Sequence, residues 1–231
     1  MVLAQDTVEE VRSFNHPVTV CIVLVLAIRL YLWHGNFDEA DQCANRMIET
    51  ANQNSLIPYQ AMVQATNGEL LVRRGQPAAG IVHLREAVDT LHTVRYELHT
   101  SSLMTAFAEG LAMTGEHTAA LEVIDGTIEA IKYRGDLFIL PELLRIKGAM
   151  LARKHSLPEA EKFLRCALDL AAQQRASAWQ LRAATSLAQF QSVHGRPEEA
   201  KAVLAPICDR FAEGADNSEL MMARSLLREL G

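Results

Sequence analysis

The chain has 231 residues, and 49% of them are hydrophobic, which is enough to build a sizeable core and argues against disorder. Its formal net charge of -6 disfavours a surface that binds nucleic acid or anionic lipid. The four cysteines, at positions 21, 43, 166 and 208, include no CxxC pair. We interpret them as small buried thiols in a reducing compartment and expect a cytoplasmic protein.

The first expected element is a short helix before position 16, with Ala4, Val8 and Val11 on one face. We interpret it as the remnant of a helix from an earlier hairpin. Repeat units bury their apolar faces only against neighbours, so such a remnant leaves the next helix partly uncovered. We therefore expect this N-terminal face to dock onto a head domain of a longer protein or, as a homodimer, onto a second copy of the chain.

Residues 17–33 form the most apolar stretch of the chain. Arg29 interrupts it after about a dozen uncharged residues, fewer than the ~20 that a membrane-spanning helix needs. A signal peptide is also disfavoured, because Asp6, Glu9 and Glu10 stand where such a peptide carries positive charge. We expect a core helix here and no membrane contact.

From position 35 onward, five short stretches recur at intervals of 40 residues: GNFDEA, GQPAAG, GEHTAA, HSLPEA and GRPEEA. The first residue is glycine in four of them, and His155 takes its place in the fourth. Seven residues earlier, four of the five repeats carry a small residue, as expected where two helices approach closely. A fixed period of this kind is typical of stacked helical hairpins.

Apolar residues three and four apart predict a helix on each side of every turn. The first helix of each repeat is expected at 17–34, 57–74, 98–114, 138–154 and 178–194. The second is expected at 37–54, 77–93, 117–133, 157–174 and 197–212. Asp216 and Glu219 are spaced as a capping box and begin a closing helix that covers the last hairpin.

These elements predict an all-α fold. The pattern of small residue, apolar residue, turn glycine and alanine resembles the tetratricopeptide repeat, with longer helices than the usual 34-residue unit. We therefore expect a right-handed superhelix, an α-solenoid, of five 40-residue tetratricopeptide-like hairpins and a C-terminal capping helix. A single domain is predicted over 1–231, with repeats near 17–55, 56–95, 96–135, 136–175 and 176–215 and the cap at 216–231.

Four longer phrases narrow the resemblance: GIVHLREAVDTL, PELLRIKGAML, WQLRAATSLAQF and FAEGADNSELMMARSLLREL. Together they look like the C-terminal helical-repeat region of bacterial signalling ATPases, a family that includes winged-helix transcriptional regulators and adenylate-cyclase-associated proteins. The resemblance implies interaction and regulation. It does not carry over ATP hydrolysis or DNA binding, because the sequence contains no GxxxxGK[ST] phosphate loop.

The sequence offers little for catalysis, metal or cofactor binding. It has no HExxH motif, no Cys/His ligand spacing and no GxSxG elbow, and none of its cysteines has a histidine within one helical turn. His34 and His194 precede turn glycines and are interpreted as tolerant polar turn positions. We expect no catalytic residue, no metal, no cofactor and no enzymatic activity.

A concave surface lined by the first helices of the repeats is the remaining candidate site. Its expected residues are Arg29, Trp33, Glu69, Arg73, Thr105, Glu109, Met113, Arg145, Arg153 and Gln189. The preferred partner is a protein or peptide, or the ATPase or effector head of the same polypeptide. Ion pairing between repeats, for example Arg73 with Glu109, is the competing explanation of these charges.

One alternative function is a small-ligand sensor whose effector lies within the superhelix. A closed pocket lined by Met62, Thr66, Thr105 and Met113 would favour it, whereas an open charged groove would favour a peptide or protein.

Overall fold

The computed structural model describes residues 2–11, 16–96, 98–211 and 218–231, all of them in helices or connections, with no strand. The chain divides into two compact units, Met1–Glu116 and His117–Gly231. This boundary falls in the third predicted turn, so the two helices of the third predicted hairpin belong to different units.

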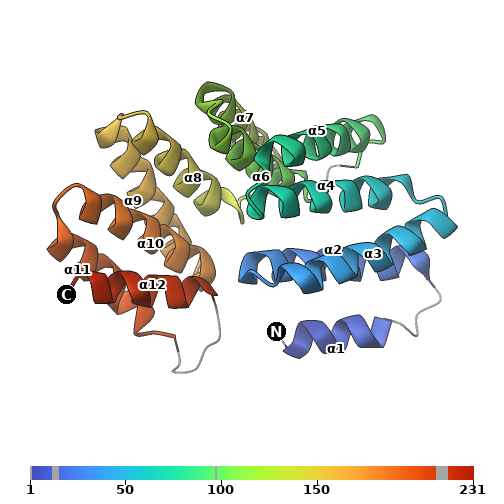
Figure 1. The fold of residues 1–231 in the computed structure, drawn as a ribbon, viewed down its shortest axis with the longest axis horizontal. Coiled ribbons are helices and arrows are strands. Elements are labelled where there is room, and N and C mark those ends of the chain that lie inside the picture. The colour runs from blue at the N-terminus through green and yellow to red at the C-terminus, as the bar shows by residue number, and fades with distance from the viewer. Residues whose placement is uncertain (1, 12–15, 97, 212–217) are drawn as a thin grey trace. The chain divides into compact units, whose positions relative to one another are not determined.

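The first unit contains a short helix, two hairpins and one further helix (Figure 1). Its helices are α1 (Val2–Glu10), α2 (Pro17–His34), α3 (Phe37–Gln53), α4 (Ile57–Arg73), α5 (Pro77–Thr93) and α6 (Thr100–Met113). Helices α2 and α3 pair as one hairpin and α4 and α5 as the next, while α6 packs against both α4 and α5. Each hairpin is thus stacked on the element that follows it, as in a helical-repeat protein.

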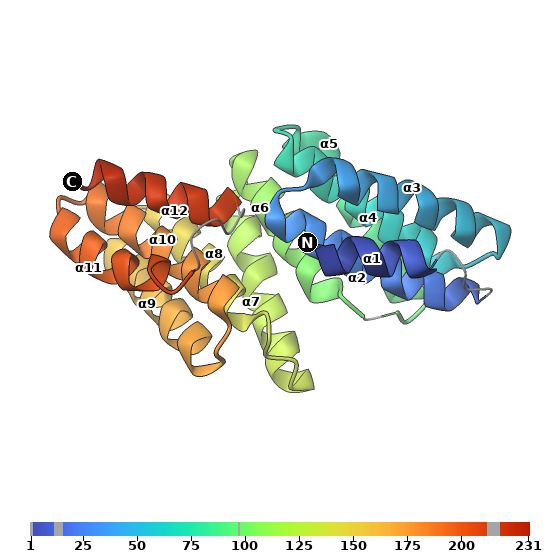
Figure 2. The same cartoon turned by 90° about the horizontal axis from the view of Figure 1, so that it is seen from below.

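The second unit continues the same pattern and ends with a closing helix (Figure 2). Its helices are α7 (His117–Arg134), α8 (Leu140–Arg153), α9 (Leu157–Gln173), α10 (Ser177–Val193), α11 (Pro197–Cys208) and α12 (Ser218–Glu229). Helices α8 and α9 form one hairpin and α10 and α11 the next, with α12 packed on both α10 and α11.

The predicted all-α architecture of tetratricopeptide-like hairpins is confirmed, and the observed helices follow the predicted bounds closely. The largest difference is in α11, which ends at Cys208 instead of 212; Pro206 lies in its last turn and removes one intrahelical hydrogen bond. Helix α6 begins at Thr100, two residues after its predicted start, because His99 adopts a left-handed backbone with φ 63°. The single-domain arrangement and the handedness over the whole chain stay predictions.

The turns inside the hairpins use the left-handed backbone that glycine tolerates best. Gly35, Gly75, Gly115 and Gly195 have φ between 74° and 89°, and His155 takes the same conformation at 60°. A second left-handed position recurs between hairpins, and among the described residues it is occupied by a glycine at Gly135. The other residues there are Ser55, Arg95 and Arg175.

Small residues let the two helices of a hairpin approach closely. A Cβ atom added to Gly68 would lie 2.9 Å from the carbonyl oxygen of Gly80, and one added to Gly80 would lie 2.6 Å from that of Gly68. In the other hairpins alanine takes the place of Gly80, and Ala40, Ala160 and Ala200 are fully buried. The small-residue pattern of the sequence therefore marks the contact inside each hairpin.

Among the described residues, α2 is the one helix long and apolar enough to cross a membrane. Half of it is buried, and Cys21, Leu24 and Ile28 are excluded from solvent in the core of the first unit. It also packs against α1, α3 and α4. These contacts are those of a core helix in a repeat protein.

Candidate interaction surface

The charged groove residues of the first unit pair with one another across helices. Arg29 of α2 approaches Glu69 of α4 to 2.8 Å, and their side chains are 4% and 3% exposed. Arg73 lies 3.6 Å from Glu69 and 3.5 Å from Glu109 of α6. We call Arg29, Glu69, Arg73 and Glu109 the first-unit ladder. Ion pairing between repeats was the alternative to a binding role for these charged residues. It is present in the structure and includes the Arg73–Glu109 pair.

The second unit has an equivalent arrangement built around a buried acid. Glu142 accepts hydrogen bonds of 2.8 Å from Nε and Nη2 of Arg145 and one of 2.6 Å from Nη2 of Arg182. Arg145 also donates to Ser186, and Arg182 pairs with Glu219 at the start of α12. We call Glu142, Arg145, Arg182 and Glu219 the second-unit ladder. It ties α8, α10 and the closing helix together.

The remaining predicted groove residues do not share one environment. Thr105 is buried and donates a hydrogen bond of 2.9 Å to the carbonyl of Ser101. Trp33 is half-buried, whereas Met113 is 49% exposed. Arg153 and Gln189 of the second unit are exposed. The groove as a binding site stays a prediction, and its charged members, except Arg153, have structural partners.

An exposed apolar row on α2 is the clearest unoccupied surface. Ile22, Leu26 and Leu30, spaced four apart, are 41%, 48% and 39% exposed. They lie 13, 9 and 5 residues before the turn glycine. We call the residues at these three positions of each repeat the stacking row. In α4, α6 and α8 every residue of this row is buried. These residues are Met62, Thr66, Leu70, Ser102, Ala106, Gly110, Glu142, Ile146 and Met150.

Gly110 of α6 shows what the stacking row normally contacts. A Cβ atom added there would lie 3.0 Å from Cγ1 of Ile81 in α5 and 3.1 Å from Cγ2 of Val72 in α4. The row thus enters the groove between both helices of the preceding hairpin. Among the described residues, α1 is the helix that packs on this side of α2, and it leaves the row exposed.

Sequence reasoning expected an uncovered N-terminal face and placed Val8 and Val11 of the first helix on it. The structure corrects the expectation for these two residues, because Val11 is 1% exposed and Val8 is partly buried against the core. The repeat register, applied to the three row positions, separates the exposed residues of α2 from its buried ones.

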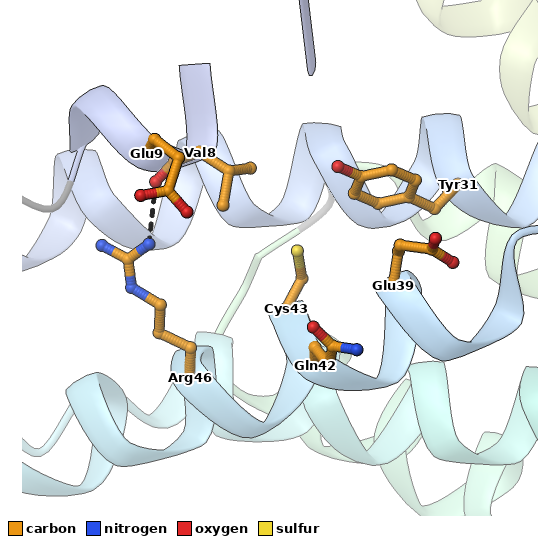
Figure 3. Close-up of a pocket in the computed structure, with 7 residues that line it drawn as sticks. All are labelled: Val8, Glu9, Tyr31, Glu39, Gln42, Cys43 and Arg46. Carbon is orange, nitrogen blue, oxygen red and sulfur yellow. Dashed lines mark hydrogen bonds between the residues drawn. The ribbon is translucent and has the colours of Figure 1, made fainter. Parts of the chain in front are cut away.

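A pocket of about 290 Å³ lies between α1, α2 and α3 (Figure 3). It is lined by Val8, Glu9, Tyr31, Glu39, Gln42, Cys43 and Arg46. Nη1 of Arg46 donates a hydrogen bond of 2.8 Å to the carbonyl of Val8 and so ties α3 to α1. Figure 3 shows Arg46 and Glu9 at one end and Glu39 beside the Tyr31 ring at the other.

The thiol and the phenol of this pocket are neutral at physiological pH. Burial raises the pKa of Cys43 to about 11 and also raises the pKa of Tyr31. A neutral thiol is a poor nucleophile and a poor metal ligand. Among the described residues no group of three His, Cys, Asp or Glu side chains could hold a metal.

The cysteines largely follow the expectation of buried thiols. Cys21, Cys43 and Cys208 are buried, and Cys166 is exposed on α9, contrary to the prediction. The turn histidines His34 and His194 approach the carbonyls of Leu30 and Phe190 through Nδ1, at 2.8 and 2.6 Å. They lie at the C-terminal ends of their helices, which fits a turn role.

The sequence matches no protein-family model and no curated protein. Its fold is similar to a Signal Transduction ATPase with Numerous Domains from Pyrococcus horikoshii that has a tetratricopeptide repeat sensor, with 9% identity and a TM-score of 0.62. That likeness covers 96% of this chain and 35% of the other protein, so the chain spans about a third of its length.

Two structures of a putative kinesin light chain from Podosopora anserina with nearly identical tetratricopeptide-like repeats are also similar. One of them, a point-substituted form, has 14% identity and a TM-score of 0.56, with 84% of this chain and 95% of the other covered. The second has 14% identity and a TM-score of 0.54, with 94% and 98% covered. At these identities the likeness shows the fold: the chain is a tetratricopeptide-like helical-repeat protein.

Proposed function

We propose that the chain is a non-catalytic interaction and regulatory module of a bacterial signalling or transcription-regulating protein. Its partner is a protein or peptide, and the ATPase or effector head of the same polypeptide is the preferred one. A homodimer through the N-terminal face is the other form of the same proposal. The resemblance to the repeat region of bacterial signalling ATPases supports this context, and with it we propose a cytoplasmic location.

The observation that carries the proposal is the exposed stacking row of α2. Three large apolar residues are exposed at a register that is buried in α4, α6 and α8. Burial of apolar surface is the main favourable term in protein association. Exposed apolar residues that line up along one helix mark an interaction site.

The charged ladders favour the stacking row over the charged groove as the binding surface. Arg29, Glu69, Arg73 and Glu109 pair with each other, so a partner that used them would have to disrupt those pairs. The sensor alternative has less support at its predicted place. Met62, Thr66 and Thr105 are buried in helix packing, and Met113 is exposed.

The test places a photo-crosslinking amino acid at Leu26 in the full chain. The matched control carries it at Val82 of α5, which is 54% exposed against 48% for Leu26. We expect a discrete crosslinked protein from Leu26 and none from Val82. A product of twice the mass of the chain identifies a second copy as the partner. Crosslinking to the same proteins from both positions, or from neither, contradicts the proposal.

A further inference from the structure

At one end of the pocket between α1, α2 and α3 lies a carboxylate that pairs with no cation among the described residues. This is Glu39 of α3, whereas its neighbours Asp38 and Asp41 both approach Arg74. The guanidinium of Arg46 lies at the opposite end, hydrogen-bonded to Val8 and next to Glu9 in Figure 3.

Tyr31 adds an aromatic ring to the lining of this pocket. Its side chain is 3% exposed, and its hydroxyl points along the pocket toward Val8 in Figure 3. Its ring stands beside Glu39 (Figure 3), and an aromatic face next to a carboxylate is a favourable place for a cation.

The fifth hairpin shows which side chains surround the acid at the equivalent repeat position. Glu199 lies 160 residues after Glu39, at the same repeat position. It accepts a hydrogen bond of 3.2 Å from Gln191, the equivalent of Tyr31, and approaches Arg196 to 3.4 Å and Arg165 to 3.6 Å. Arg196 also lies 5.9 Å from the ring centroid of Phe190. The acid in the fifth hairpin therefore lies near two guanidinium groups, which it shares with Glu161, and one of them is close to an aromatic ring.

At the first hairpin both arginines are replaced by neutral amides. Asn36 stands at the position of Arg196, and Gln5 stands at the position of Arg165. The acid is retained, the two arginines are replaced, Tyr31 stands at the position of Gln191, and a pocket lies beside the acid. A ligand that supplies the missing cation would complete the pattern.

We propose that this pocket binds a small organic cation, with a guanidinium or ammonium group at Glu39 and a short alkyl chain running along Cys43 toward Val8. The neutral thiol and the valine provide an apolar wall for the chain, and Tyr31 provides a ring face for the head group. The volume of about 290 Å³ fits a small ligand. This site is separate from the stacking row and does not depend on the proposed interaction function.

The probe is n-butylguanidinium, titrated by calorimetry into the full chain, with n-butylurea as its neutral isostere. We expect saturable binding with a dissociation constant of about 1 mM or tighter for the cation and no measurable binding of the urea. Glu39→Gln is expected to weaken binding at least about tenfold, because a charge-assisted hydrogen bond is lost. Glu49→Gln, an exposed acid on the same helix that does not line the pocket, should leave binding unchanged.

A second variant guards against a folding defect in the first. Asn36→Arg restores an arginine of the fifth hairpin and should compete with the added cation, so that binding weakens while the helical content stays that of the native chain. The proposal is overturned if the cation does not saturate, if n-butylurea binds as well as n-butylguanidinium, or if folded Glu39→Gln binds like the native chain.

Discussion

The last hairpin of the second unit is covered by α12, whereas the first hairpin of the first unit is covered by α1 only in part. Helix α12 contributes Leu220 and Ala223, both fully buried, and its Glu219 pairs with Arg182. Helix α1 accepts a hydrogen bond from Arg46 and leaves the stacking row of α2 exposed. A terminal helix therefore closes a repeat stack when it supplies both an apolar face and the partner of the last charged residue.

The two ladders also differ in how fully their buried charged groups are hydrogen-bonded. Glu142 in the second unit is surrounded by donors from two arginines. In the first unit Nε and Nη2 of Arg29 are buried without a hydrogen-bond partner among the described residues. The first unit thus carries both the less satisfied interior charge and the less covered end.

The closing helix gives the largest expected effect. Leu220→Ala removes a fully buried side chain from the core of the last hairpin and is expected to lower the free energy of unfolding by about 3 kcal/mol. Met221→Ala, next to it and 55% exposed, should change it by less than about 0.5 kcal/mol. Chemical denaturation measures both. Equal effects would mean that α12 does not close the stack.

The buried pair of the first-unit ladder comes next. Arg29→Met leaves Glu69 without its closest cation and is expected to destabilise the chain by about 3 kcal/mol, while Arg29→Met combined with Glu69→Leu should recover most of the loss. Arg165→Met, in a pair whose arginine is 48% exposed, should have an effect below about 1 kcal/mol. A double variant no more stable than Arg29→Met would show that burial of an unpaired acid is not the cause.

Two helical glycines, Gly68 of the first unit and Gly126 of the second, should respond in opposite directions to alanine. In Gly68→Ala the new methyl group would lie 2.9 Å from the Gly80 carbonyl oxygen, and we expect a loss of about 2 kcal/mol. Gly126 has nothing within 4 Å, so Gly126→Ala should gain about 0.5 to 1 kcal/mol from helix propensity. Thermal denaturation decides the sign, and a gain for both variants would refute the close contact within the hairpin.

The fourth turn gives the smallest expected effect. His155 holds a left-handed backbone that disfavours a side chain, so His155→Gly is expected to raise the free energy of unfolding by about 1 kcal/mol. The reverse change at the equivalent first-unit turn, Gly75→Ala, should lower it by a similar amount. Melting temperatures that move in the same direction in both variants would contradict the shared turn geometry.

The helices, the turns inside hairpins and the small-residue contacts were predictable because each leaves a periodic mark in the sequence. Gly68 and the turn glycines are examples. The turns between hairpins were not recognised, since Ser55, Arg95 and Arg175 adopt a left-handed backbone without being glycine. The charged rows were recognised, but whether Arg29 meets solvent or Glu69 depends on contacts 40 residues apart, which a periodic pattern does not determine.

The pocket escaped sequence reasoning for a similar reason. Tyr31, Glu39 and Cys43 are close in sequence and were not identified as a site, because the space beside them depends on how far α1 covers the first hairpin. The register comparison of Glu39 with Glu199 became informative only when the contacts of Glu199 with Arg196 and Arg165 were known.

The central claim is that the stacking row of α2 is exposed in the isolated chain, although the same row is buried in the next repeat. Leu26 and Thr66 occupy the same position of this row, at 48% and 1% exposure. The most direct measurement is the free energy of unfolding of Leu26→Glu and Thr66→Glu, followed by circular dichroism during urea denaturation. The account predicts a change below about 0.5 kcal/mol for Leu26→Glu and a loss above about 3 kcal/mol, or complete unfolding, for Thr66→Glu. A loss for Leu26→Glu as large as that for Thr66→Glu would show that the row is already covered and would contradict the account.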